Sequence, residues 1–187
     1  MSNNLENERR ELLGLLKRLS YRRGKVVLAS GRTSDFYIDC RQTALNARGH
    51  VLIGRLLFDL IHRNFPEAVG VGGPTLGADP LVSAVSLTSS LQEHPLHGFL
   101  VRKEAKSHGT GSFVEGLANL EQGSPVVVVE DVITSGGSIL RAAEHVAEAG
   151  LQVAGLVVLV DRQEGGRQVI EQAGHRLLSL FDRSDFL

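Results

Sequence analysis

The chain has 187 residues and a formal net charge of −1. Apolar residues make up 42% and charged residues 22% of it, a globular composition that excludes a disordered chain. So small a net charge gives no reason to expect a nucleic acid or a membrane as a partner. Cys40 is the only cysteine, which excludes an internal disulfide and favours a reducing compartment. Because the N-terminal segment also lacks the apolar core of a signal peptide, we predict a cytoplasmic protein.

The predicted elements alternate between amphipathic helices and short apolar strands. In chain order we predict a helix over 5–20, strands over 26–28 and 36–39, a helix over 47–63, a strand over 68–71, a helix over 77–89, strands over 98–101 and 126–129, a helix over 139–147 and a strand over 153–160. Continuous apolar strands between such helices predict an α/β fold, in which helices flank a central, mostly parallel sheet. With no repeat, low-complexity tract or linker, we predict a single domain over residues 1–187. Sheets of this kind bind ligands beyond the carboxyl ends of their strands.

The most informative strand end lies in VVVVEDVITSGGSIL, residues 126–140. An apolar strand runs into Glu130 and Asp131, and the hydroxyl and glycine residues 134–138 then lead into a helix. The start of a helix, with glycines and hydroxyl donors, suits a phosphate group. Two carboxylates would repel a phosphate, but they accept hydrogen bonds from the hydroxyls of a sugar. The stretch therefore predicts a ribose 5-phosphate site, and the alternative is a capped helix after an acidic loop.

Residues 126–138 resemble the phosphoribosyl-diphosphate (PRPP) binding motif of the type I phosphoribosyltransferases, with Glu130 where that family often has Asp. Three more segments resemble the orotate phosphoribosyltransferases: SGRTSDFYID (30–39), VRKEAKSHGTG (101–111) and DRQEGG (161–166). The resemblance implies a Rossmann-like core with a small hood formed by the N-terminal and C-terminal segments. It also implies transfer of the 5-phosphoribosyl group from PRPP to N1 of orotate. The products would be orotidine 5′-monophosphate and pyrophosphate, in pyrimidine (UMP) biosynthesis.

The resemblance assigns PRPP binding to a basic loop and to the acidic motif. The residues are Arg102, Lys103, Lys106 and His108 in the loop, and Glu130, Asp131, Val132, Ile133, Thr134, Ser135, Gly136, Gly137 and Ser138 in the motif. Catalysis is expected from Arg102, Lys103, Lys106, His108 and Asp131. Closely spaced cations stabilise the charge that develops on a departing pyrophosphate, and His108 can donate a proton to it. The alternative for this segment is a solvated basic surface loop.

For orotate, the resemblance implies contacts from Tyr37, Ile38, Thr134 and Arg162. A guanidinium offers paired donors to the carboxylate and ring carbonyls of orotate. The alternative for Arg162 is a surface ion pair with Glu164, and the alternative for Tyr37 is packing within the sheet.

The resemblance further implies Mg²⁺ as cofactor, bound mainly through PRPP, with Glu130 and Asp131 nearby but no direct protein ligand. It implies a homodimer in which the catalytic loop, with Lys103, completes the partner's site. Two cations that some relatives carry are absent here, at Ala29 and near Gly77, so either other groups bind the pyrophosphate or the affinity for PRPP is lower. Two rival functions remain at this point: a purine or other base phosphoribosyltransferase, and a PRPP-sensing regulator without catalysis.

Overall fold

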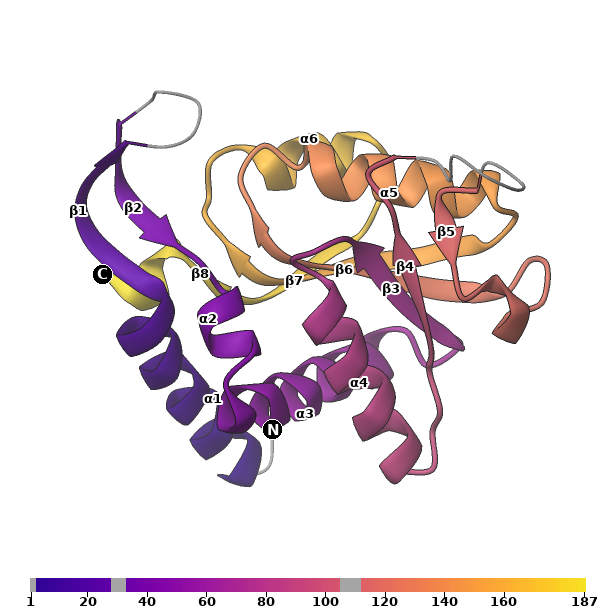
Figure 1. Ribbon diagram of the computed structural model, residues 1–187, viewed down its shortest axis with the longest axis horizontal. Coiled ribbons are helices and arrows are strands. Elements are labelled where there is room, and N and C mark those ends of the chain that lie inside the picture. The colour runs from indigo at the N-terminus through magenta and orange to yellow at the C-terminus, as the bar shows by residue number, and fades with distance from the viewer. Residues whose placement is uncertain (1–2, 28–32, 105–111) are drawn as a thin grey trace.

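The computed structural model describes residues 3–27, 33–104 and 112–187. Their main feature is a six-stranded sheet with the order β5-β4-β3-β6-β7-β8 (Figure 1). Its strands are β3 (Gly70–Pro74), β4 (His97–Val101), β5 (Val114–Glu115), β6 (Pro125–Ile133), β7 (Gln152–Asp161) and β8 (Leu177–Asp182). Neighbouring strands pair in parallel, apart from the antiparallel pair β4 and β5. The strand order reverses between β3 and β6, so the carboxyl ends of these two strands flank the crevice where such sheets bind ligands.

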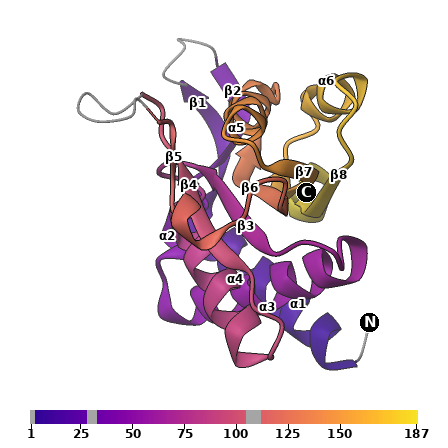
Figure 2. The same ribbon diagram turned by 90° about the vertical axis from the view of Figure 1, so that its right-hand side faces the viewer.

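Helices cover both faces of the sheet, as Figures 1 and 2 show. On one face lie α1 (Asn3–Leu15), its π-helical extension η1 (Leu16–Ser20), α3 (Ala47–Asn64) and α4 (Asp79–Leu91); on the other lie α5 (Gly137–Glu148) and α6 (Gly166–Gln172). Val127 and Val129 of β6 pack with the first set, and Val126 and Val128 with the second. This burial on two sides accounts for the uninterrupted valine run and confirms the predicted α/β fold. None of the helices in the described ranges has the length and apolarity to cross a membrane.

A small hood stands beside the carboxyl ends of the strands (Figure 1). It consists of an antiparallel pair, β1 (Tyr21–Val27) and β2 (Thr33–Ile38), from which the short helix α2 (Arg41–Ala44) leads back to the core. The C-terminal turn η3 (Arg183–Phe186) packs against this pair. The ring of Phe186 lies 5.5 Å from that of Tyr21 and 5.6 Å from that of Phe36, between ring centroids. N-terminal and C-terminal segments therefore build the hood together, as the resemblance implied.

Some elements differ in extent from the sequence prediction. The strand predicted over 126–129 continues to Ile133, because its last residues pair with β7 as far as Asp161. Glu130 and Asp131 therefore lie inside the strand and not beyond its end. The sequence analysis did not predict the short elements α2, β5, η2 (Leu117–Asn119), α6 and β8. These elements are too short for a clear periodicity, and packing against distant segments decides their conformation.

The packing of the hood predicts the effect of removing one ring. Phe186→Ala leaves a cavity between β1, β2 and the core, and we expect it to lower the free energy of unfolding by about 3 kcal/mol. Amide hydrogen exchange should rise most in Tyr21 and Phe36–Ile38. Urea denaturation at a fixed protein concentration measures the first effect. The neighbouring variant Leu187→Ala is the control, because Leu187 is 79% exposed. Equal stability of the two variants would contradict this account of the hood.

Candidate active site

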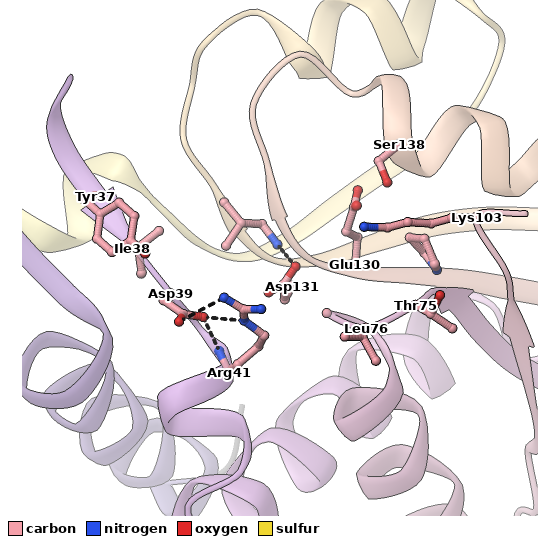
Figure 3. A pocket seen from close by; sticks show the side chains of 13 residues that line it. Tyr37, Ile38, Asp39, Arg41, Thr75, Leu76, Lys103, Glu130, Asp131 and Ser138 are labelled. Atoms are coloured by element: carbon pink, nitrogen blue, oxygen red, sulfur yellow. Dashed lines mark hydrogen bonds and ion pairs between the residues drawn. The ribbon is translucent and has the colours of Figure 1, made fainter. Parts of the chain in front are cut away.

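A cleft of about 290 Å³ opens at the carboxyl ends of β3 and β6, against the hood (Figure 3). Its lining comes from four parts of the chain: Tyr37 and Ile38 of β2 in the hood, with Asp39 and Arg41 just after it; Pro74 at the end of β3, with Thr75, Leu76 and Gly77 after it; Lys103 after β4; and Glu130, Asp131, Val132 and Ser138 from β6 and α5. The cleft therefore brings together the acidic motif, the start of the basic loop and the segment after β2. It lies where the topology of the sheet predicts a ligand site.

The two carboxylates of β6 line this cleft, Glu130 buried and Asp131 half-buried. Glu130 is 9% exposed, and burial raises its pKa from the ordinary 4.5 to about 7, although a hydrogen bond from Ser138 opposes the rise. Burial also raises the pKa of Asp131, against the effect of the backbone N–H of Val132, which donates to its Oδ1 at 2.9 Å. A buried carboxylate favours its neutral form until a cation or a hydrogen-bond donor approaches. The pair is therefore suited to accept the hydroxyls of a ligand.

The loop between β6 and α5 has the backbone expected of an anion site. Thr134 and Ser135 follow the buried Ile133, and Gly136 takes a left-handed conformation, φ +80°, directly before Gly137 opens the helix. The first N–H groups of an α-helix have no partner within the helix, and the helix dipole favours an anion there. We refer to residues 134–137 as the phosphate loop, after the site that the sequence predicts there.

The segment Asp161–Gly166 holds this loop in place. A Cβ on Gly166 would overlap the carbonyl oxygen of Thr134 and lie 2.9 Å from the backbone nitrogen of Gly136. Only a residue without a side chain allows so close an approach between the two segments. The sequence analysis did not anticipate this role for Gly166, since no local pattern connects it with the phosphate loop.

Arg162 is buried between β7 and the hood and does not line the cleft. Its side chain is 7% exposed, and Nη2 donates to the carbonyl oxygen of Phe36 at 3.0 Å and to Oε1 of Glu164 at 2.6 Å. The ion pair with Glu164 that the sequence left open is therefore present, but its arginine is not on the surface. Tyr37 and Ile38 do line the cleft, on the hood side, whereas Thr134 does not.

The basic loop is only partly described. Lys103 lines the cleft of its own chain. Arg102 is exposed and forms an ion pair through Nη1 with Oε1 of Glu115, at 3.2 Å, beside a neighbouring cavity lined also by Arg141. Lys106 and His108 lie outside the described residues.

The comparison with known proteins agrees with this geometry. Residues 71–173 match the phosphoribosyl transferase domain family. The chain is 48% identical over 181 residues to the orotate phosphoribosyltransferase of Sorangium cellulosum, covering 97% of this chain and 94% of that protein. It is 49% identical over 185 residues to that of Thermosynechococcus vestitus, with coverages of 99% and 96%. The chain belongs to the orotate phosphoribosyltransferase family.

A solved structure supports the same conclusion. The crystal structure of Mycobacterium tuberculosis orotate phosphoribosyltransferase in complex with PRPP is 37% identical, with a TM-score of 0.79 and coverage of 96% of this chain and 98% of that one. Similarity over nearly the whole length of orotate enzymes decides against the two rivals that the sequence left open, a purine phosphoribosyltransferase and a regulator without catalysis.

Six residues that line the cleft of this orotate phosphoribosyltransferase were not predicted for the site: Asp39, Arg41, Pro74, Thr75, Leu76 and Gly77. Asp39 and Arg41 come directly after β2, where the strand-end rule could have identified them, but the hood strands gave only a weak sequence signal. Gly77 lies against the acid pair: a Cβ there would be 2.5 Å from Oδ1 of Asp131. The peptide bond between Thr75 and Leu76, in the same loop, is cis.

The raised pKa of Glu130 predicts a pH-dependent gain in stability on Glu130→Gln. Since the pKa rises from 4.5 in the unfolded chain to about 7 in the folded chain, ionisation destabilises the fold increasingly between these values. We expect the variant to gain little below pH 4.5 and roughly 3 kcal/mol above pH 7, with loss of activity. Urea denaturation at pH 4.5 and pH 8 measures the difference.

The control for this prediction is Glu11→Gln. The pKa of Glu11 is lowered by a hydrogen bond from Arg48, so its neutral variant should not gain stability at high pH. A stability gain of Glu130→Gln that is the same at both pH values would contradict a buried carboxylate with a raised pKa at this position.

Proposed function

We propose that this member of the family transfers the 5-phosphoribosyl group of PRPP to N1 of orotate, forming orotidine 5′-monophosphate and pyrophosphate in UMP biosynthesis. The observation that carries the proposal is the acid pair, Glu130 buried and Asp131 half-buried, in a cleft that Ser138 in the first turn of α5 also lines. A sugar hydroxyl and a phosphate on the same ligand satisfy both features. PRPP carries both groups and a diphosphate at the reacting carbon.

In this proposal each wall of the cleft has one task. The backbone of residues 132–138 binds the 5-phosphate, and Glu130 and Asp131 accept hydrogen bonds from the ribose hydroxyls. When the bond to the diphosphate breaks, positive charge develops on the ribose ring, and the ionised acids stabilise it. Lys103, with Arg102, Lys106 and His108, stabilises the negative charge that develops on the leaving group.

Orotate enters from the hood side. We propose that Tyr37 and Ile38 border the pyrimidine, which leaves its N1 facing the ribose. Arg162 and Thr134 are the further contacts that we propose for orotate. Because Arg162 donates to the backbone of Phe36, it also fixes the strand that carries Tyr37 and Ile38. Orotate can be presented as an anion at N1, so the proposal requires no general base.

Mg²⁺ is the proposed cofactor, held mainly by the diphosphate of PRPP. In the described part of the chain, no group of three His, Cys, Asp or Glu side chains is placed to hold a metal ion. Mg²⁺ commonly binds substrate phosphates together with one or two carboxylates, and Glu130 and Asp131 are the carboxylates nearby. When bound, the ion neutralises charge on the leaving group.

We further propose a homodimer in which the basic loop is shared between the two active sites. Lys103 lines the cleft of its own chain, so the residues that would act in the partner's site are those further along the loop, including Lys106 and His108.

We also propose a cytoplasmic location. It fits Cys40, which is free and buried. Burial raises the pKa of this thiol well above its ordinary value.

The substrate proposal predicts a clear result in a base-specificity assay. With PRPP and Mg²⁺ we expect turnover of orotate, and none of hypoxanthine, adenine or uracil. Removal of Mg²⁺ with EDTA should abolish the reaction, and added Mg²⁺ should restore it. Release of pyrophosphate and loss of orotate absorbance measure turnover. Turnover of a purine without turnover of orotate would overturn the substrate assignment, and full activity in EDTA would overturn the cofactor.

The shared loop predicts recovery of activity in mixed dimers. Lys106→Ala and Arg162→Ala should each lose activity about 100-fold or more, because each removes an interaction with a charged ligand group. Random mixing makes half of the dimers mixed, each with one intact site if Lys106 acts across the interface, so about a quarter of the wild-type rate returns.

Lys103→Ala mixed with Arg162→Ala is the matched control. Since Lys103 lines the cleft of its own chain, both sites of such a mixed dimer are damaged and no activity returns. The subunits are unfolded and refolded together so that they exchange. Absence of recovery with Lys106→Ala would contradict the shared loop, and recovery with Lys103→Ala would contradict its action within one chain.

A further inference from the structure

The segment between the hood and the core carries an ion pair that faces the cleft. Arg41, the first residue of α2, donates from Nε to Oδ1 of Asp39 at 2.7 Å and from Nη2 to Oδ2 at 3.1 Å. Gln42 donates to the same carboxylate at 3.3 Å, and the backbone N–H of Arg41 donates to it at 3.2 Å. These hydrogen bonds lower the pKa of Asp39, with that from the Arg41 side chain as the largest cause. The carboxylate therefore stays ionised and holds the guanidinium in one orientation.

The guanidinium of Arg41 points into the cleft. Its side chain is 51% exposed, and Figure 3 shows it between Asp39 and Asp131. Its positive charge opposes the burial that raises the pKa of Asp131. Asp131 in turn lies against the loop after β3, since a Cβ on Gly77 would be 2.5 Å from its Oδ1. Arg41 is therefore on the side of the cleft that Asp131 and the Thr75–Gly77 loop form.

A diphosphate in this cleft requires a cationic side chain near it, because carboxylates outnumber cations in the lining. Among the described residues, its ionisable lining consists of three carboxylates, Asp39, Glu130 and Asp131, and two cations, Arg41 and Lys103, with Tyr37. The Thr75–Gly77 loop itself has no cationic side chain. A diphosphate carries several negative charges, and the acid pair of β6 repels it. Within the described residues, the ion pair engages Nε and Nη2 of Arg41, which leaves Nη1 for an oxygen of the ligand.

We propose that Arg41 binds the diphosphate of PRPP against the Thr75–Gly77 loop, and that Asp39 is the positioning residue that orients it. The inference rests on the proposed function, because it takes PRPP as the ligand of the cleft. A guanidinium that is already fixed loses little freedom when it binds a phosphate oxygen. Arg41 thus supplies the positive charge that the loop after β3 lacks.

The kinetic test separates the two substrates. Charge-assisted hydrogen bonds contribute about 1.5–3 kcal/mol, so Arg41→Gln should raise KM for PRPP about 10- to 100-fold. KM for orotate should stay within about twofold, because the diphosphate and the pyrimidine occupy different walls. Arg41→Lys keeps the positive charge without the paired N–H donors of the guanidinium. Asp39→Asn keeps the arginine without the carboxylate that orients it. Both should raise KM for PRPP less than Arg41→Gln does, and Asp39→Asn should do so with little change in kcat.

The chain offers a matched control in Arg48. Its guanidinium pairs with Glu11 in the same two-pronged way, from Nε at 2.8 Å and from Nη2 at 2.7 Å, and is 52% exposed. This pair lies outside the cleft, so Arg48→Gln should leave both KM values at their wild-type level. Urea denaturation establishes that each variant is folded. If Arg41→Gln does not fold, Arg41→Lys serves as the test variant in its place.

Calorimetric titration of the full chain with PRPP and Mg²⁺, without orotate, distinguishes failure of this inference from failure of the proposed function. Weaker PRPP binding by Arg41→Gln, with unchanged binding by Arg48→Gln, supports the inference. If the wild type binds PRPP and Arg41→Gln binds it equally well, the inference is wrong and the proposed function stands. A rise confined to KM for orotate also overturns it, in favour of a contact with the pyrimidine. If the wild type binds no PRPP, the proposed function itself fails.

Discussion

The burial of Glu130 and the partial burial of Asp131, near the end of β6, are the constraint on which the rest of the cleft depends. Removing a carboxylate from water disfavours its charged form, and burial is the largest cause of the raised pKa of both groups. The strand tolerates this because Val126–Val129 are fully buried between two helical layers, and Val126–Val128 are paired with a strand on either side. Apolar burial along β6 thus fixes two poorly solvated acceptors in place, and a ligand that donates to them replaces the water they have lost.

The positive charges of the cleft come from segments other than β6. Arg41 stands at the start of α2, after the hood, and Lys103 follows β4, which is separated from β6 by β3. A cation on β6 itself would pair directly with Glu130 or Asp131. Cations carried on separate walls instead face the acids across an open volume, so a ligand with both hydroxyls and anionic groups can contact each wall. The topology thus places the acids and the cations in one cleft but on different segments of the chain.

How much of this site the sequence could predict depends on how local each feature is. The acid pair and the residues 134–138 are contiguous, and a strand and a helix frame them, so their pattern alone predicted a phosphate and a sugar. Arg162 was predicted as an orotate contact from its segment, and its burial against the carbonyl of Phe36 depends on a contact across 126 positions of sequence that no local pattern indicates. Asp39 and Arg41 were missed for a related reason, because the hood strands pack on a C-terminal turn and show no clear periodicity of their own.

The segment Asp161–Gly166 connects the two ends of the cleft. Gly166 approaches the phosphate loop closely enough to exclude a side chain, and Arg162 donates to the backbone of β2 in the hood. Asp161, 2% exposed, holds the turn between them by accepting from the backbone N–H of Gln163 at 2.8 Å and from Nε of Arg167 at 3.1 Å. One short turn after β7 therefore sets the position of the phosphate loop and of the hood strand together. The fold therefore fixes the distance between the phosphate loop and the hood strand before a ligand binds. This reduces the entropy lost when a ligand that spans both of them binds.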